Sequence, residues 1–444
     1  MQKNKYIKSL YLLLLFLVCG NAVAQQNDRN VVWVHGLGGT QADWTRYDVI
    51  FENERNINGS RPNVANTGNG IAAASNRLEN RVNTNLGTEA TNSQNMGIGH
   101  SMGGLLLRDM DSRQTDNFGG IITVASPNYG AGVANSVNNG DVTAVAQNAC
   151  EKLSAGPASQ LFGLPWAVVG NLTTQILCNT FIDNDLVQDL VGNDQAVTDL
   201  SIGSPALNTL NSFNATIPRI SVYAEENSPV HWRLMSSTLN GNDTELQSEV
   251  NSARGIYNGL YTYHTTTAIA CAVGGFWNPW CWAKSANSYY KARQWKKGRD
   301  WIDDSETVWS SLIQTSRVEQ ETYWVATWIP CDMVDPMSFR LNPTPNLDCG
   351  PYGGGGDVYG YGYWEWQERT RWITVNYPSD GLLPKYTQEL QDIPSGNKYQ
   401  ITGANHMELL DMSNSTLNGV PNDATYEVFE QIFDRQLGDF FRTD

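Results

Sequence analysis

Basic charge and histidine are both scarce in this chain of 444 residues. Lys and Arg total 29 against 45 Asp and Glu, which gives a formal net charge of −16. No block of basic residues offsets this excess, so nucleic acids and anionic membranes are expected to be poor partners, and neutral substrates fit better. The chain has only five His, which shortens the search for a general base.

Long apolar runs are lacking apart from one near the N-terminus. Residues 10–18 form a short apolar core that follows three lysines and precedes the small-x-small sequence AVA at 22–24. This order is typical of a signal peptide, predicted here for residues 1–24. The run is too short to span a bilayer. We therefore expect a secreted or periplasmic protein with no integral membrane segment after cleavage.

Cysteine is sparse and not spaced as in metal sites. Six cysteines follow the predicted cleavage point, and an even number in an exported chain predicts three disulfides. The sequential pairing closes the shortest loops and is the one we expect: 150–178, 271–281 and 331–349. No cysteine has the tight spacing of metal ligands, so a zinc site is not expected, and no metal or other cofactor is predicted.

Apolar runs alternate with helical periodicity in the first third of the chain. Residues 31–34 and 120–125 have the composition of buried strands, and 63–66 and 94–98 are weaker strand candidates. Residues 70–85 carry apolar side chains at three-to-four spacing, as in an amphipathic helix, and a helix is also expected near 42–51. This alternation predicts an α/β protein with a mostly parallel sheet flanked by helices.

Two long segments interrupt this pattern. We expect the first part of the α/β core in residues 25–130, a helical lid insertion in 131–217 and a core strand in 218–228. A Trp-rich cap insertion in 229–371 and the last part of the core in 372–444 complete the prediction. Within the cap, we expect helices over 284–318 and strands at 323–329 and 363–372. Residues 372–376 are expected to lead back to the core, and 427–441 to form a closing helix.

The tryptophans of the cap have two interpretations. They can form the core of a small cap, or an apolar wall beside an active site that accepts acyl chains or aromatic groups. The two are compatible, and the sequence leaves both open.

Residues 99–103, GHSMG, fit the G-x-S-x-G pattern. A strand candidate precedes them, and residues 104–110 have helical character. A serine on a sharp strand-to-helix turn has its hydroxyl pushed out of the sheet and its backbone at a helix N-terminus. The chain contains 40 Gly, so a chance match is the alternative. The context favours Ser101 as a catalytic nucleophile.

The nucleophile needs a base, and the base needs an orienting acid. His406 lies in a loop after the candidate strands and is the predicted base, because the chain order nucleophile, acid, histidine is usual for this arrangement. Asp380 lies 26 residues earlier, before a glycine, and is the predicted acid. A surface-loop histidine and an ordinary turn aspartate are the structural alternatives. Competing acids are Glu225, Glu226, Asp303 and Asp304.

A tetrahedral oxyanion needs preorganised donors. The backbone N–H of Met102, the first helical residue after the nucleophile, is one candidate. The N–H of Leu37, in the glycine-rich turn after strand 31–34, is the other. The alternative for this turn is simply a tight strand-to-helix connection.

These motifs together resemble the α/β-hydrolase superfamily, and more closely secreted bacterial lipases and the related GPI-inositol-deacylase-like and palmitoyl-thioesterase-like esterases. The resemblance covers about 31–130, 218–226 and 372–444. It implies Ser101 as nucleophile, Asp380 and His406 as its partners, and Leu37 and Met102 as oxyanion donors. In such lipases an acidic residue two places after the histidine helps bind calcium. The corresponding residue is Glu408, so the resemblance leaves open a structural calcium ion at this position.

The resulting hypothesis is a secreted serine hydrolase, a lipase or esterase, that cleaves carboxylic esters of lipid-like substrates through a Ser-Asp-His triad and an acyl-enzyme. A lipid acyltransferase, thioesterase or phospholipase could use the same triad, as could an amidase. A non-catalytic exported lipid-binding protein is the alternative outside enzymes.

Overall fold

The computed structural model describes residues 29–55, 57–142, 144, 195–226, 243–274, 279–330, 362–410, 416–417, 420–421 and 424–443. These fall into two compact units, of which one is Ser316–Asn376 and the other contains the rest of the chain. The predicted signal peptide lies outside the described residues, as do most of the cysteines. Cys271 is disulfide-bonded.

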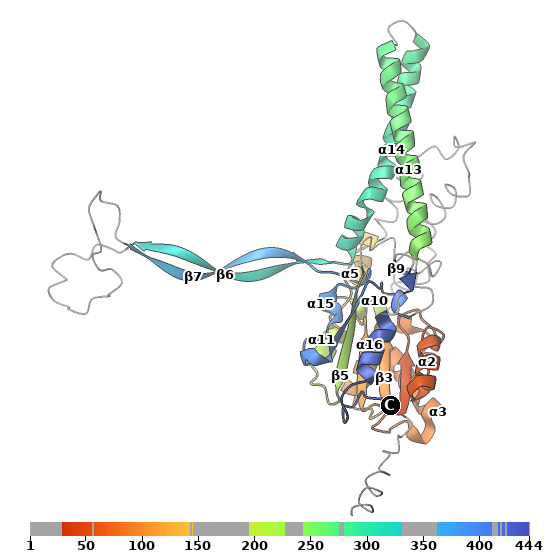
Figure 1. The fold of residues 1–444 in the computed structure, drawn as a ribbon, viewed down its shortest axis with the longest axis vertical. Coiled ribbons are helices and arrows are strands. Elements are labelled where there is room, and N and C mark those ends of the chain that lie inside the picture. The colour runs from red at the N-terminus through yellow and green to blue at the C-terminus, as the bar shows by residue number, and fades with distance from the viewer. Residues whose placement is uncertain are drawn as a thin grey trace, which may run out of the picture. The chain divides into compact units, whose positions relative to one another are not determined.

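The first unit is built on a parallel sheet of six strands in the order β2-β1-β3-β4-β5-β8. Figure 1 shows the strands side by side with helices packed around them. The strands are β1 (Arg29–Val34), β2 (Ile57–Ser60), β3 (Met96–His100), β4 (Gly120–Val124), β5 (Arg219–Glu225) and β8 (Lys398–Thr402). The predicted α/β-hydrolase fold, a parallel sheet flanked by helices, is confirmed.

Helices cover both faces of this sheet. Alternate residues of β1 divide between two apolar clusters, Val31 and Trp33 in one, Val32 and Val34 in the other. This follows from the two-residue period of a strand. The first cluster includes α2 (Thr45–Arg55) and α16 (Ala424–Phe433), and the second includes α3 (Ile71–Leu86) and α4 (Met102–Ser112). Burial on both faces explains why the core strands are almost continuously apolar.

Shorter elements lie between β2 and β3, between β4 and β5, and around β8. They are α5 (Gly132–Asn138), α10 (Gln195–Leu200), α11 (Pro205–Ser212), α15 (Lys385–Gln388), β9 (Thr416–Leu417), β10 (Val420–Pro421), and the 3₁₀ turns η1 (Thr67–Asn69), η2 (Gly87–Glu89), η7 (Ser395–Asn397) and η8 (Glu408–Leu410).

The predicted cap contains two long helices, α13 (Asp243–Gly274) and α14 (Pro279–Leu312), which lie side by side in Figure 1. The sequence predicted helix over 284–318, so α14 was partly expected, although it ends before residue 313. α13 was missed, because glycine and a run of three threonines lower its helix propensity.

The second unit is an antiparallel hairpin of β6 (Ser316–Pro330) and β7 (Gly362–Asn376). Its register runs from Ser316 opposite Asn376 to Pro330 opposite Gly362. The expected strands at 323–329 and 363–372 fall inside these longer ones. Residues 372–376, expected to return to the core, are the end of β7.

Two further expectations were wrong in detail. The strand proposed at 63–66 is irregular, because Val64 donates its N–H to the buried ring of His35 and Asn66 has a left-handed φ of 55°. The second strand is β2 instead. The closing helix ends at Phe433, not at residue 441.

Candidate active site

Ser101 occupies a strained turn between β3 and α4. Its φ of 52° and ψ of −128° lie outside the regions that non-glycine residues usually adopt, a cost of about 1–3 kcal/mol that recurs at functional sites. The Ser101 N–H donates to the carbonyl of Val124 at 2.9 Å, which ties the turn to the next strand. Ser101 is partly exposed while the residues on both sides of it are buried.

The glycines two residues before and two residues after Ser101 let this turn form, because they have no side chains. A Cβ on Gly99 would lie 2.5 Å from the carbonyl carbon of Gly103, and one on Gly103 would lie 2.6 Å from the carbonyl oxygen of Val34. Both separations are too short for a real side chain. The two glycines of the motif are therefore required by the close approach of strand, turn and helix.

The turn after β1 lies directly against Ser101. A Cβ on Gly36 would come within 2.8 Å of the Ser101 Cβ. Among the described residues, the backbone N–H groups of Leu37 and Met102 donate no hydrogen bond. These two N–H groups are therefore available as donors, and that of Met102, the residue after the serine, also lies at the positive end of the α4 dipole.

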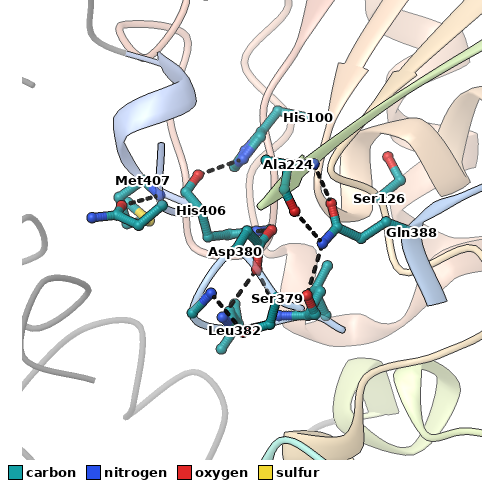
Figure 2. Close-up of polar contacts among 12 residues, drawn as sticks. His100, Ser126, Ala224, Ser379, Asp380, Leu382, Gln388, His406 and Met407 are labelled. Carbon is teal, nitrogen blue, oxygen red and sulfur yellow. Dashed lines mark hydrogen bonds and ion pairs between the residues drawn. The ribbon is translucent and has the colours of Figure 1, made fainter. Parts of the chain in front are cut away.

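His406 and Asp380 form a buried pair. Asp380 Oδ2 lies 2.7 Å from His406 Nδ1, and the two side chains are 0% and 2% exposed. The other carboxylate oxygen accepts the N–H groups of Leu382 and Leu383 at 3.0 and 2.7 Å, as Figure 2 shows. The His406 N–H also donates to the Asp380 carbonyl at 2.7 Å. This network holds the imidazole with Nδ1 turned toward the acid.

The competing acids do not reach His406. Glu225 pairs with Lys385 at 3.0 Å, and Asp303 pairs with Arg254 at 2.6 Å, while Asp304 is exposed. Glu226 is buried next to residues 377–384, the loop that carries Asp380 (the acid loop). Its N–H donates to the carbonyl of Ser379 at 2.8 Å. Of the candidates, the structure brings Asp380 to the histidine.

The His406 ring packs against the residue that precedes the serine. The centroids of the His100 and His406 rings are 4.6 Å apart, and His100 Nε2–H donates to the His406 carbonyl at 3.0 Å. Burial and the neighbouring His406 lower the pKa of His100 well below 6.5, so its ring is neutral. Among the described hydrogen bonds, none joins Ser101 Oγ to the His406 ring, and such contacts often tighten only when substrate binds.

His35 fixes the turn after β1. It is fully buried, its Nδ1–H donates to the Gly36 carbonyl at 2.9 Å, and its Nε2 accepts the Val64 N–H at 3.1 Å. Burial lowers the pKa of this imidazole. Both ring nitrogens are occupied, so His35 holds the turn in place and is not available to take a proton from Ser101. His231 lies outside the described residues, and His264 belongs to α13.

Three polar side chains support the site in ways that the sequence did not predict. Gln388 is fully buried and joins β5 to the acid loop, because it exchanges hydrogen bonds with the Ala224 backbone and donates to the Leu383 carbonyl at 2.7 Å. No local pattern marks it. Asn405 and Glu408 flank His406 as a reciprocal cap, a spacing that the sequence does carry.

Glu408 was the predicted link to calcium. Its Oε2 accepts the Asn405 N–H at 2.9 Å, so this carboxylate helps to hold the histidine turn. No cluster of three or more His, Cys, Asp or Glu side chains that could hold a metal occurs within the part of the chain described above.

The base of the helical cap contacts the acid loop. Trp309 of α14 donates its indole N–H to the Gly381 carbonyl at 2.6 Å. Trp309, Leu312 and Leu382 share an apolar cluster with the candidate oxyanion residues Leu37 and Met102. Trp295 is also buried, whereas Trp324 of the hairpin is 62% exposed. The buried pair fits the interpretation of a cap core, and Trp309 also contributes to apolar surroundings for the acid loop.

Comparison with known proteins gives one family match. Residues 24–137 match the family described as "Putative serine esterase (DUF676)", a segment that includes Ser101 and the turn after β1. No curated protein matches the chain. None of the helices in the ranges described above is long and apolar enough to cross a membrane.

Several solved structures are similar over part of the chain. An extracellular α/β-hydrolase from a Paenibacillus species is 15% identical, with 44% of this chain and 77% of that one covered and a TM-score of 0.27. Est816, described as an N-acyl homoserine lactone degrading enzyme, is 15% identical, with coverages of 50% and 82% and a TM-score of 0.28. The fluorophosphonate-binding serine hydrolase FphF of Staphylococcus aureus is 16% identical, with coverages of 46% and 68% and a TM-score of 0.25. Scores this low do not by themselves establish a shared function.

The parallel sheet, with a strained serine between its third strand and the helix that follows, gives the fold class directly. The family match supports a hydrolase of the esterase type. The chain has the α/β-hydrolase fold, and its N-terminal part is similar to a family of serine esterases.

Proposed function

We propose that this protein is an exported serine hydrolase that cleaves carboxylic esters of lipid-like substrates through Ser101, His406 and Asp380. The observation that carries the proposal is the pairing of a strained serine turn with a buried His–Asp pair. Few structural needs other than nucleophilic catalysis require a serine in this conformation. The predicted signal peptide supports export.

In acylation, Ser101 Oγ attacks the ester carbonyl carbon while His406 Nε2 takes the hydroxyl proton. Asp380 accepts the Nδ1–H of His406, which keeps Nε2 free as the base and stabilises the imidazolium that forms. The N–H groups of Leu37 and Met102 receive the negative charge on the former carbonyl oxygen. One such donor contributes on the order of 10²–10³ in rate.

The intermediate collapses when the C–O bond to the alcohol breaks. The imidazolium of His406 gives its proton to the leaving alkoxide, which departs as the alcohol and leaves an acyl-Ser101 ester. Water then attacks the acyl carbon, with His406 as base again, and the carboxylic acid is released with Ser101 regenerated.

Two features support a neutral, apolar ester as the substrate. The net charge of −16 disfavours anionic substrates in bulk solution. The candidate oxyanion residues belong to an apolar cluster that extends to Trp309 and Leu382, which suits an acyl chain better than a polar group.

The test is the Ser101→Ala variant with a series of p-nitrophenyl esters from short to long acyl chains. We expect kcat to fall by on the order of 10⁴ or more, with loss of labelling by a fluorophosphonate probe. Ser112→Ala, on the same helix and bonded only to the Asp109 carbonyl, is the matched control and should retain activity. Turnover near the wild-type value in Ser101→Ala would falsify the mechanism.

The same assay with an added alcohol separates hydrolysis from transfer. A hydrolase releases the free acid even when alcohol is present, whereas an acyltransferase forms the new ester in preference. Predominant ester formation would replace the hydrolase proposal with a lipid acyltransferase that uses the same triad.

A further inference from the structure

Charge is unevenly distributed along the two cap helices. Residues 250–299 contain seven of the 29 basic residues and none of the 45 acidic ones: Arg254, Lys284, Lys291, Arg293, Lys296, Lys297 and Arg299. A chain with a net charge of −16 therefore has one strongly cationic segment. That segment covers most of α13 and the first two thirds of α14.

Large apolar side chains are exposed on the same segment. Tyr263 and Ile269 of α13 are each 60% exposed, and Tyr289 and Tyr290 of α14 are 61% and 63% exposed. The helix pair has its own interior, to which Tyr257, Ala268, Ala292 and Trp295 contribute as buried residues. The exposed tyrosines are therefore not needed to hold the two helices together.

Helix geometry places four exposed side chains on one face of α14. At about 100° per residue, Tyr289, Tyr290, Arg293 and Lys297 fall within an arc of roughly 100°. Two contacts set the register of this helix against α13. Ser285 Oγ donates to the Ala268 carbonyl at 2.8 Å, and the rings of Tyr257 and Trp295 are 5.2 Å apart. Between these two contacts, Tyr263 comes level with Tyr289 and Tyr290. Ile269 lies further along, close to the level of Lys284.

Cations that form no ion pair within the described residues accompany the exposed tyrosines. Lys284, Arg293 and Lys297 are exposed, and none of the ion pairs in the described part of the chain includes them. By contrast, Lys296 and Arg299 are paired with Asp300, and Arg254 with Asp303, near the end of the cationic segment. Among the described residues, the cations without an ion pair are therefore concentrated where the tyrosines are exposed.

This surface lies at the end of α14 that is remote from the hydrolase core. Trp309, Leu312 and the following Ile313 belong to the core cluster. At about 1.5 Å per residue, a helix advances roughly 35 Å from Tyr289 to Leu312. Ions screen charges beyond about 8–10 Å, so the acidic residues of the core weaken the local positive field only slightly.

We propose that this face, defined by Tyr289, Tyr290, Arg293 and Lys297 of α14, docks the protein on an anionic phospholipid surface. Ammonium and guanidinium groups bind lipid phosphates, and tyrosine rings are favoured at the depth of the headgroups, with the ring in the apolar zone and the hydroxyl in water. The face lies on the interface without spanning it. The total charge predicted poor binding to anionic membranes, and the local distribution reverses that expectation.

This proposal is independent of the ester chemistry. The full-length Ser101→Ala protein is therefore used in sedimentation with vesicles of phosphatidylglycerol and phosphatidylcholine, and with vesicles of phosphatidylcholine alone. We expect binding to the anionic vesicles at least tenfold tighter, with a steady decrease as salt is raised from 0.05 to 0.5 M. Equal binding to both vesicle types, or no binding to either, would overturn the proposal.

Variants that remove positive charge test whether this face of α14 binds the vesicles. Each basic residue near an anionic surface contributes about 1 kcal/mol, roughly fivefold, so Arg293→Gln/Lys297→Gln should weaken binding by on the order of 30-fold. Arg81→Gln, on α3, is the control: Arg81 is exposed, forms no ion pair within the described residues, and should behave as wild type. Unchanged binding in the double variant contradicts the assignment.

A second pair of measurements separates a lipid surface from other partners. Tyr289→Ser/Tyr290→Ser keeps every charge and should still weaken binding several-fold, because the interfacial rings are lost. If single-stranded DNA displaces the vesicles completely at equimolar phosphate, the face binds polyanions in general, and the lipid proposal fails. Circular dichroism of each variant confirms that the helices remain folded.

Discussion

The core sheet and the β6–β7 hairpin are both β structure, but they are stabilised in opposite ways. Every residue of β3 and β4 is buried. In the hairpin, none of the side chains whose exposure is described is buried, and Trp372 is 71% exposed. The hairpin relies on cross-strand pairs, such as Arg371 with Glu321 at 2.7 Å and with the Tyr323 ring at 4.9 Å.

Such pairs contribute about 0.2–1 kcal/mol each, and a two-stranded hairpin in water is marginal at best. Burial on two faces, by contrast, fixes register and can support a residue in a costly conformation. The strained serine lies at the end of such a strand. We therefore expect function to depend steeply on small changes in the core and weakly on large changes in the hairpin.

After Ser101→Ala, the largest effect is expected for Asp380→Asn. The amide can donate to His406 Nδ1, which would place the ring proton on Nε2 and remove the base. We expect kcat for a p-nitrophenyl ester to fall by on the order of 10³–10⁴ with little change in KM. Glu225→Gln is the control, because Glu225 pairs with Lys385 rather than with the histidine. A larger loss in the Glu225 variant would mean that the acid is assigned to the wrong residue.

A smaller loss is expected for Gly36→Ala. The added methyl would lie 2.8 Å from Ser101 Cβ, so the turn must move and the Leu37 N–H is displaced from the oxyanion position. We expect kcat to fall by about 10–10³-fold, and unfolding to become easier by about 1–3 kcal/mol.

Gly259→Ala on α13 is the matched control for Gly36→Ala. A Cβ at Gly259 meets nothing within 4 Å. There the methyl should stabilise the helix by up to about 1 kcal/mol and leave kcat unchanged. Equal kcat values in the two variants would show that the turn after β1 has no role in catalysis.

The next effect concerns pH and the two buried histidines of the core. Burial lowers the pKa of His35 and of His100 below 6.5, so the unfolded chain binds their protons more readily than the folded one. Their contribution to stability is complete above pH 6.5 and is lost as pH falls toward their folded pKa values. Each adds a slope of about 1.4 kcal/mol per pH unit in that window.

Urea unfolding of wild type and His35→Gln between pH 4.5 and 7.5 measures this slope. The variant should be less stable at pH 7.5, because hydrogen bonds to the Gly36 carbonyl and from the Val64 N–H are weakened. Its stability should nevertheless fall less steeply below pH 6.5. Parallel curves for the two proteins would show that the ring is protonated in the native state.

The sequence also predicts the buried core, including the turn at Ser101, better than it predicts the exposed hairpin. The residues around Ser101 are local and constrained by close packing, so a five-residue pattern predicted both the turn and its glycines. Asp380 and His406 were predicted from chain order and resemblance, and the structure pairs them. The His100–His406 contact joins residues 306 positions apart, and Gln388 bonds residues 164 positions away, so no local pattern could mark either.

The hairpin was predicted only as two shorter strands, because two-sided exposure gives little apolar alternation to define its ends. The same lack of a buried face explains why residues 372–376 were assigned to the core. α13 was missed for a different reason, since its partly exposed surface carries tyrosine, threonine and glycine where most helices carry charged residues.

The smallest effect on the core is expected from removing the hairpin altogether. The Tyr377 N–H donates to the Thr315 carbonyl at 2.8 Å, and Ser316 lies opposite Asn376, so the chain leaves and re-enters the first unit at adjacent backbone positions. An Asn-Gly turn between Ser316 and Asn376 fits this spacing. We expect hydrolysis of a short soluble p-nitrophenyl ester within about threefold of wild type, since the proposed triad and its supporting hydrogen bonds all lie in the other unit. Thermal unfolding followed by tryptophan fluorescence should give a similar midpoint. A collapse of activity or stability would mean that this exposed strand pair acts on the core, and the contrast between the two kinds of β structure would not extend to function.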